Sequence, residues 1–290
     1  MIITINGDRI EYTLEDENTA GDVIKSLTSW LEESGLILAS LRLNGESVLM
    51  TDKEWRKRPV DDLAAMDLEA IGVRESRIRQ LETARDYFIL LNNAVESQGS
   101  EALVELSEGY GDLLRILPNL LGEGQNPSIM THLESTMETA GFPIREGKTV
   151  TDRELLSKES AKIAYILEGR RKETENPDAE AASAAEALSV LAEKLDDVAV
   201  HLQTGKDKQA MDTIIVLTEM LQRLMRALSW SEGAFDREEL ADDMTGILAE
   251  LEEALKASDT VLIGDLLEYE IKPRLLELPG KLNYSGEAAS

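Results

Sequence analysis

The hydrophobic periodicity of the chain changes near residue 74, and this change constrains the fold more than any other feature of the sequence. Before that point, short segments rich in β-branched residues are separated by turns, which is the pattern of strands. From Glu75 onward, apolar residues recur every three or four positions, which is the pattern of amphipathic helices. The sequence therefore predicts an α+β protein, mostly α, with a small N-terminal sheet module followed by antiparallel helical bundles.

The first 73 residues contain five strand candidates and one helix candidate. Asn6-Gly7 and Asn44-Gly45 each lie between two strand candidates, and both favour a tight hairpin because Asn and Gly accept positive φ angles. Between the two hairpins, Thr19 can cap a helix that Gly35 would end. A short turn and a last strand, from Leu68 to Val73, complete the order ββαββ–turn–β.

This element order resembles that of the β-grasp, or ubiquitin-like, fold. Ubiquitin and its sulfur-carrier relatives act through a free C-terminal Gly-Gly, whereas Gly72-Val73-Arg74 runs directly into a helix candidate. Ferredoxin-type β-grasp domains need cysteines, and the sequence has none. The resemblance therefore implies a protein–protein interaction module over residues 1–73; the alternative is a domain that only caps the helical part.

The helical remainder divides into a domain over residues 74–172 and a four-helix bundle over 178–279, and residues 280–290 are expected to be a disordered tail. Glu173 to Asp178 is the clearest linker, because Asn176-Pro177 disfavours a helix. The predicted helices of the first domain cover about 75–98, 102–117, 128–140 and 151–172. Those of the bundle cover about 178–203, 206–230, 236–257 and 259–278.

Short connections between the last four helices predict that neighbouring helices are antiparallel. Two prolines are expected to interrupt helices, since a proline ring clashes with the carbonyl group four residues before it. Pro118 and the stretch from Gly122 to Pro127 should end the helix of residues 102–117, and Pro273 should kink or end the last helix near Tyr269.

The last third of the chain resembles an uncharacterised family of bacterial helical-bundle proteins, and the segment from Asp259 to Leu275 carries most of this likeness. It is also loosely similar to flagellar and type III export chaperones, which are acidic helical bundles. Those chaperones are shorter and lack a β-grasp domain. The resemblance implies a protein-binding role and brings no catalytic residues with it.

The chain is strongly acidic, with 30 Lys and Arg against 57 Asp and Glu and a formal net charge of −27. This balance argues against binding to nucleic acid and to anionic membranes, because both require clustered cations. The net charge is −8 over residues 1–73, −3 over 74–172 and −16 over 173–290. The acidic last third can attract basic partners, or it can simply be a solvated surface.

The sequence offers little material for catalysis or for a cofactor. It has no cysteine and only two histidines, His132 and His201, which lie far apart in the chain. Gly147-Lys148-Thr149 invites comparison with a P-loop, but that motif needs a glycine at position 142, which is Phe. We therefore predict no catalytic residues, no metal site and no cofactor. The first residues do not have the cationic region and following apolar stretch of a targeting segment. No apolar run in the sequence is long enough to span a bilayer. Both features favour a cytoplasmic location.

Two groups of residues are candidates for partner binding. Trp55, Arg56, Lys57 and Arg58 form a cationic cluster with an aromatic residue, a composition common at binding hot spots. The cluster could dock an acidic segment of a partner or of the acidic last third. The alternative is a half-buried Trp55 flanked by solvated charges.

The second group comprises four methionines of the bundle, Met211, Met220, Met225 and Met244. Flexible methionine side chains suit adaptable binding surfaces, so they could line a groove that holds an amphipathic helix of a client. The alternative is that they fill the core.

These features together predict a non-enzymatic cytoplasmic adaptor or chaperone that binds a protein client. The alternative is a structural scaffold that associates with itself, as a homo-oligomer, or docks into a larger assembly. An enzyme with an unrecognised carboxylate site is a third hypothesis, which would require a concave pocket with carboxylates of raised pKa.

Overall fold

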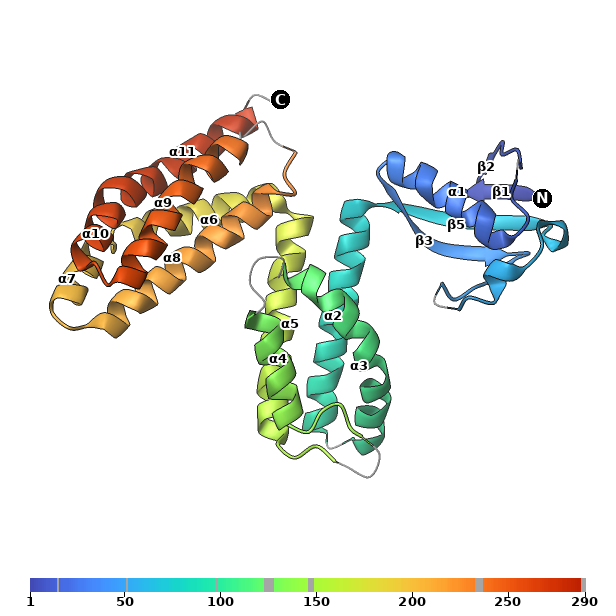
Figure 1. The fold of residues 1–290 in the computed structure, drawn as a ribbon, viewed down its shortest axis with the longest axis horizontal. Coiled ribbons are helices and arrows are strands. Elements are labelled where there is room, and N and C mark those ends of the chain that lie inside the picture. Colours follow the sequence, from blue (N-terminus) through green and yellow to red (C-terminus); the bar gives the residue numbers. More distant parts are fainter. Residues whose placement is uncertain are drawn as a thin grey trace. The chain divides into compact units, whose positions relative to one another are not determined.

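The computed structural model describes residues 1–14, 16–50, 52–97, 99–122, 128–145, 149–232 and 237–287. The chain forms two compact units, Met1–Ala164 and Tyr165–Ser290 (Figure 1). The first unit begins with a five-stranded sheet and continues into helices, and the second is helical throughout its described part. The prediction of an α+β protein that is mostly α is therefore confirmed.

The N-terminal domain has the element order that the sequence predicts. Its strands pair in the order β2-β1-β5-β3-β4, with β1 and β5 parallel in the middle and the other pairs antiparallel. The N-terminal domain is thus a small mixed sheet around a central parallel pair, with one helix; its resemblance to the β-grasp fold stays a prediction. The elements are β1 Ile2–Ile5, β2 Asp8–Ile10, α1 Ala20–Glu33, β3 Leu36–Leu43, β4 Glu46–Ser47 and β5 Ala65–Gly72.

Local sequence signals account for the ends of these elements. Asn6 and Asn44 both have positive φ angles, as do the glycines that follow them, so both hairpin turns form as expected. Thr19 caps α1, and its side chain and that of Asp22 form the reciprocal bonds of a capping box. Gly35, with a φ of +71°, lies just after the helix ends.

The core of the N-terminal domain lies between α1 and one face of the sheet. Apolar residues of α1 at helical spacing, such as Val23 and Leu27, are buried against strand residues such as Leu41 and Met66. Trp55, at the start of a short 3-10 helix over Trp55–Lys57, is part of this core.

Four helices follow the sheet: α2 Val73–Glu96, α3 Ser100–Leu121, α4 Ser128–Thr139 and α5 Arg153–Glu175. The last of them, α5, continues from the first unit into the second. The helix does not end at Pro118, because α3 continues through it to Leu121; it ends at Gly122, where the predicted Gly122–Pro127 break begins. The last turn is retained because Leu120 and Leu121 are buried. Arg77 also donates hydrogen bonds to the carbonyls of Asn119 and Leu120, which satisfies acceptors at the end of the helix.

The second unit contains α6 Pro177–Ala192, α7 Asp196–Gln203, α8 Asp207–Leu228, α9 Arg237–Ala257, α10 Thr260–Asp265, the π-helical segment η3 Leu266–Ile271 and α11 Lys272–Glu287. The helix predicted over 178–203 is divided into α6 and α7 by a turn at residues 193–195. In this turn the amide of Leu195 donates to the carbonyl of Ala192, three residues back, and the Leu195 side chain is buried. The tight turn therefore keeps this leucine in the core.

The linker predicted from Glu173 to Asp178 is instead almost entirely helical. The end of α5 includes Glu173, which is 5% exposed, and α6 begins at Pro177, one residue after the break at Asn176. Arg226 of α8 contacts both carboxylate oxygens of Glu173, at 2.7 and 3.0 Å. This buried ion pair fixes the segment in the helical unit, since an unpaired buried charge would be costly.

Pro273 affects the last helix at the expected place but does not end it. The preceding segment η3 has π-helical geometry, and it contains Tyr269, whose carbonyl would meet the proline ring in a regular α-helix. The helix then continues as α11 through residues 280–287, where the sequence predicts a disordered tail. Burial of Leu275 and Leu278 and packing of Leu282 on the core favour this continuation; residues 288–290 lie outside the described part.

Candidate functional site

The predicted cluster around Trp55 divides into a buried aromatic ring and exposed cations. Trp55 is 3% exposed, and its indole N–H donates to the Leu49 carbonyl at 3.0 Å. The guanidinium of Arg56 lies 5.2 Å from the centroid of the indole ring, and Lys57 pairs with Glu54 at 2.7 Å. The Trp55 ring is thus committed to the core, while Arg56, Lys57 and Arg58 remain exposed at the surface.

The four predicted methionines lie on two helices and differ in exposure. Met211, Met220 and Met225 belong to α8, and Met244 belongs to α9. Met244 is buried, Met220 and Met225 are partly buried and pack on the core, and Met211 is exposed. Sequence spacing could not show this difference, because all four occupy amphipathic helices.

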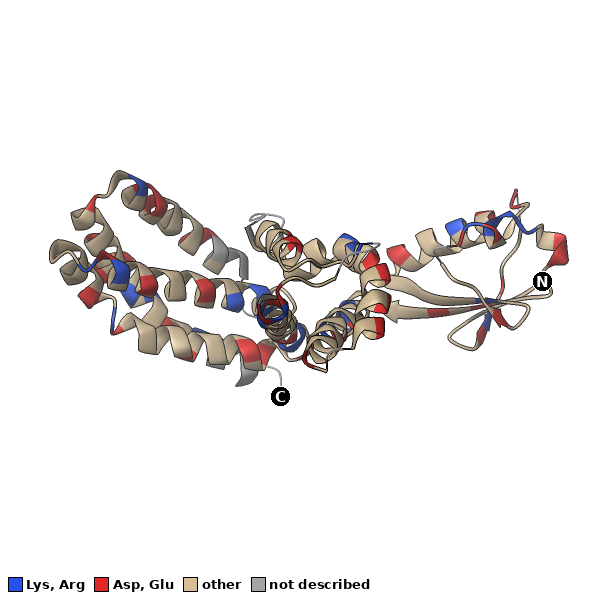
Figure 2. Ribbon diagram, turned by 90° about the horizontal axis from the view of Figure 1, so that it is seen from below, with Lys and Arg blue, Asp and Glu red and all other residues tan. Residues whose placement is uncertain are grey.

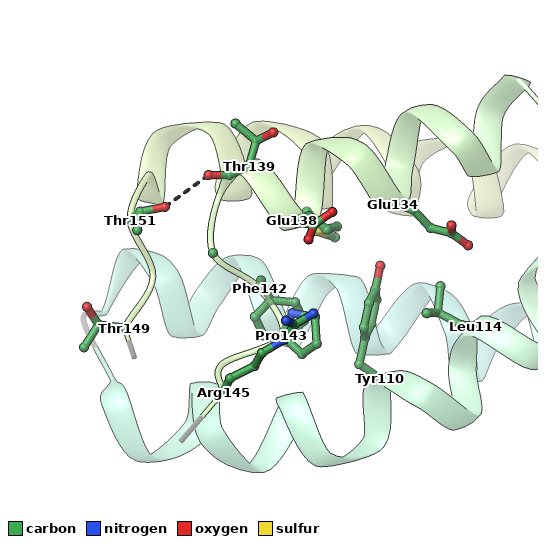
Figure 3. Close-up of a pocket in the computed structure, with 12 residues that line it drawn as sticks. Tyr110, Leu114, Glu134, Glu138, Thr139, Phe142, Pro143, Arg145, Thr149 and Thr151 are labelled. Carbon is green, nitrogen blue, oxygen red and sulfur yellow. Dashed lines mark hydrogen bonds between the residues drawn. The ribbon is translucent and has the colours of Figure 1, made fainter. Parts of the chain in front are cut away.

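A cavity of about 690 Å³ lies in the first unit between α3, α4 and the segment that joins α4 to α5 (Figure 3). Its apolar lining includes Leu114, Met137, Phe142 and Pro143. The polar lining comprises Tyr110, Glu134, Glu138, Thr139, Arg145, Thr149 and Thr151. Gly147 and Lys148 of the P-loop-like sequence lie outside the described residues; Thr149 is described, and it lines the cavity.

Backbone and side-chain hydrogen bonds fix the connecting segment at the mouth of the cavity. The amide of Thr151 donates to the Ala140 carbonyl at 2.9 Å, and its hydroxyl donates to the Thr139 carbonyl at 3.1 Å (Figure 3). Gly141 has a φ of +78°, and a Cβ at this position would lie 3.0 Å from the Thr151 amide nitrogen. The segment needs glycine at position 141 both for the positive φ angle and because the backbone passes so close to Thr151.

Tyr110 forms the inner wall of the cavity. Its ring meets Phe142 edge-on, with the centroids 5.2 Å apart, and stacks on Tyr87 at 6.3 Å. The Tyr110 hydroxyl is buried and has no hydrogen-bond partner among the residues that the structure describes. Burial raises its pKa well above the usual value, and the charges of Glu134 and Glu159 add to this effect. At neutral pH this phenol stays protonated, so it can form a hydrogen bond but cannot act as a base.

Glu159 of α5 is a second buried polar group in the same unit. Its carboxylate lies 3.7 Å from the His132 Nε2 atom and 3.7 Å from the Lys162 Nζ atom, while within the described part of the chain its Oε1 atom has no hydrogen-bond partner. The sequence contains no motif that joins Tyr110 to Glu159, because the two residues belong to different helices. These groups were therefore missed by reasoning from spacing alone.

The surface of the second unit combines negative charge with exposed apolar side chains. Acidic residues are spread over its helices (Figure 2). Met211, Ile215 and Val216 are exposed on α8, and Val261, Leu262, Tyr269 and Leu276 are exposed on the helical run from α10 to α11. Exposed apolar side chains that form a contiguous patch mark surfaces that contact other proteins, whereas single ones are common on any protein surface.

Two further classes of site were sought in the described part of the chain. It contains no group of three His, Cys, Asp or Glu side chains placed to hold a metal ion. Within the same residues, no helix has the length and apolar character needed to cross a bilayer.

Comparison with known families assigns two segments of the chain. Residues 1–72, which form the sheet domain, match the family model described as the TP0873 N-terminal domain. Residues 181–280 match the model described as a domain of unknown function, DUF8042. The last third is thus similar to an uncharacterised family, while its likeness to export chaperones stays a prediction. No match was found among the curated proteins or among the solved structures.

Proposed function

We propose that the chain is a non-enzymatic cytoplasmic adaptor or chaperone that binds a protein client through its C-terminal helical unit. The observation that carries this proposal is the presence of apolar residues on two sides of α8. The inner side buries Ile214 and Leu217 in the core, whereas Ile215 on the outer side is 50% exposed and Met211 is 39% exposed. A surface helix normally presents polar residues outward, so the outer apolar side favours coverage by a partner.

The N-terminal domain supports the proposal as a second contact surface. Arg56, Lys57 and Arg58 are exposed cations in a chain of strong negative charge. They suit an acidic segment of a partner, and their contribution would come from charge because the Trp55 ring is buried.

The cavity beside Tyr110 favours binding over catalysis. Its phenol is held protonated by burial, and the described residues that line it include neither histidine nor cysteine. General acid–base catalysis is most efficient when the pKa of the catalytic group lies near the working pH. The cavity therefore favours a role in binding part of a ligand over a role as an active centre.

The experiment that tests this function is partner capture with the tagged full-length chain in its native host, followed by mass spectrometry. The variant Ile215→Glu places a carboxylate in the exposed apolar surface of α8. The matched control Gln209→Glu adds the same charge at an exposed position of the same helix without removing an apolar side chain. The proposal predicts one dominant partner that Ile215→Glu loses and Gln209→Glu retains.

Two results would contradict the proposal. Equal capture by Ile215→Glu and the wild-type chain would show that α8 does not bind the client. If the wild-type chain forms a dimer in sedimentation velocity and the Ile215→Glu variant is a monomer, the result would instead support the self-associating scaffold.

A further inference from the structure

The outer side of the C-terminal helix carries a row of apolar residues, which we call the outer stripe: Val261, Tyr269, Pro273 and Leu276. The helix runs without interruption from α10 through η3 into α11. Val261, Asp265, Tyr269 and Pro273 follow one another at four-residue spacing, which places side chains on one side of a helix. Val261 is 64% exposed and Tyr269 is 63% exposed, while Ile263, Leu267 and Ile271 of the same run are buried.

Close contacts on both sides hold this helix in place. The backbone of α10 approaches α7 so closely that a Cβ at Gly264 would lie 2.8 Å from the Ala199 Cβ atom. Lys272 pairs with Asp196 of α7 at 2.6 Å, and Arg274 pairs with Asp243 of α9 at 2.9 Å. The outer stripe therefore lies on a preorganised surface, which lowers the entropic cost of binding.

The charges beside the outer stripe are predominantly negative. Asp265 lies within the row, and Glu268 borders Tyr269 and Lys272. A hydrogen bond to Glu268, together with the charges of Glu268, Asp265 and Asp196, raises the pKa of the Tyr269 hydroxyl. The cations beside the stripe, Lys272, Arg274 and Lys281, are each paired with a carboxylate, so the surplus charge is negative.

The π-helical geometry of η3 adds a second distinguishing feature. Tyr269 lies inside this segment, and Pro273 lies directly after it within α11. Short π-helical segments are rare and are frequently found at functional sites. Here the segment places an exposed aromatic residue, a type enriched at binding hot spots, in the middle of the outer stripe.

We propose that the outer stripe is a docking surface for a basic amphipathic helix of a partner protein. This inference rests on the proposed function; it adds a second surface of the same helical unit, beside the one on α8, and names the class of partner. Apolar side chains of the partner would pack on Val261, Tyr269 and Leu276, and its Lys and Arg residues would face the surrounding carboxylates. A second copy of the same surface is disfavoured, because two acidic faces repel each other.

The inference can be tested with a defined peptide and the full-length chain. The probe is a fluorescein-labelled amphipathic helix of Leu and Lys, about 18 residues or five turns long. A second peptide with Glu in place of Lys tests the requirement for positive charge. Anisotropy titrations should show binding of the Lys peptide, weaker binding at higher salt, and no binding of the Glu peptide.

The decisive variant is Tyr269→Ser, and Tyr165→Ser is its matched control. Tyr165 is another tyrosine of the second unit, and it is 81% exposed. Loss of a central aromatic anchor should weaken binding of the Lys peptide by about tenfold or more, whereas Tyr165→Ser should leave it unchanged. Because both side chains are exposed, neither substitution is expected to unfold the chain, and circular dichroism can verify this.

Three outcomes would overturn the inference. They are equal binding of the Lys peptide by Tyr269→Ser and the wild type, equal weakening by Tyr165→Ser, and a wild-type dimer that Tyr269→Ser abolishes. The captured client separates the two proposals. A client lost by Ile215→Glu but retained by Tyr269→Ser would leave the proposed function standing and refute this surface. The peptide titration decides the surface even where no client is captured.

Discussion

The side-chain amide of Asn6 makes two hydrogen bonds with the backbone of Ala70, a residue 64 positions away in the sequence, and both bonds are 2.9 Å long. Asn44, in the other hairpin turn, accepts hydrogen bonds from the amides of Ala64 and Ala65, at the beginning of the same strand. Each turn residue therefore shapes its own hairpin and also holds β5. Because α2 begins directly after β5, these bonds also fix where the helical part starts.

Replacing Asn6 with alanine should destabilise the N-terminal domain by about 2–3 kcal/mol. The substitution leaves the backbone N–H and carbonyl of Ala70 without their side-chain partner. It also removes the side-chain hydrogen bonds that offset the cost of a positive φ angle at this position. Urea unfolding monitored by tryptophan fluorescence would measure this change. Asn18→Ala is the control, because the exposed Asn18 amide contacts only the nearby Asp16 carbonyl. A loss from Asn6→Ala no larger than that from Asn18→Ala would contradict the interpretation.

The buried ion pair of Glu173 and Arg226 should make the junction of α5 and α6 sensitive to charge removal. Glu173→Gln leaves the guanidinium without its carboxylate in a largely buried setting, and we expect a loss of about 3–5 kcal/mol. Glu252→Gln is the matched control, because its partner Lys256 and Glu252 itself are mostly exposed. That pair should be worth about 1 kcal/mol or less. Similar midpoints for the two variants in chemical unfolding would argue for a loose linker.

Gly264 and Gly246 should respond oppositely to alanine. At Gly264 the added methyl group would meet Ala199, so overpacking should cost about 1–3 kcal/mol. Gly246, inside α9, has open space where a Cβ would be placed, so alanine should gain about 0.5–1 kcal/mol from helix propensity. Thermal unfolding of the two variants would check both signs. A stabilising Gly264→Ala substitution would refute the close approach of α10 and α7.

The unpartnered hydroxyl of Tyr110 should reduce stability at neutral pH, so Tyr110→Phe is expected to stabilise the first unit by about 1 kcal/mol. Tyr87→Phe is the contrasting variant, because it removes a hydrogen bond to the Leu106 carbonyl and should destabilise. Urea unfolding at pH 7 distinguishes the two. Destabilisation by Tyr110→Phe would mean that this hydroxyl has a partner in solution, for which Glu134 and Glu159, whose charges both act on the phenol, are the candidate acceptors.

The same tyrosine predicts a loss of stability in alkali. The pKa of Tyr110 is raised in the folded state, so the unfolded chain releases the phenol proton first as the pH rises. The folding free energy linked to this proton is therefore complete below the ordinary tyrosine pKa near 10 and is lost as the pH rises above that value. Tyr110→Phe should therefore flatten the fall in unfolding free energy between about pH 10 and 11. An unchanged alkaline slope in the variant would contradict the burial of this phenol.

Much of the fold follows from local signals in the sequence. The Asn-Gly turns and the capping box of Thr19 depend on residues within a few positions, and the structure has both where they are predicted. The errors concern distant contacts. Asn176-Pro177 indicates a linker when read locally, but Glu173 binds Arg226, 53 positions away, and this contact decides the outcome. Pro118 likewise ends a helix in isolation, whereas burial of the last turn retains it.

The candidate sites were less predictable for the same reason. Composition identified Trp55 and the methionines, but burial separates Trp55 and Met244 from their exposed neighbours, and burial depends on packing across the domain. Tyr269 and Val261 lie in a segment that the sequence marks as a helix with a proline. Only the packed structure shows which side of that helix remains open to solvent.

Cross-linking mass spectrometry of the full-length chain with its captured client would test the central claim most directly, because it locates the client on the surface. The account predicts cross-links from the client to lysines of the C-terminal unit, above all Lys272 and Lys281 beside the outer stripe. Cross-links confined to Lys53 and Lys57 of the N-terminal domain would contradict the claim, and so would a monomeric chain that captures no client.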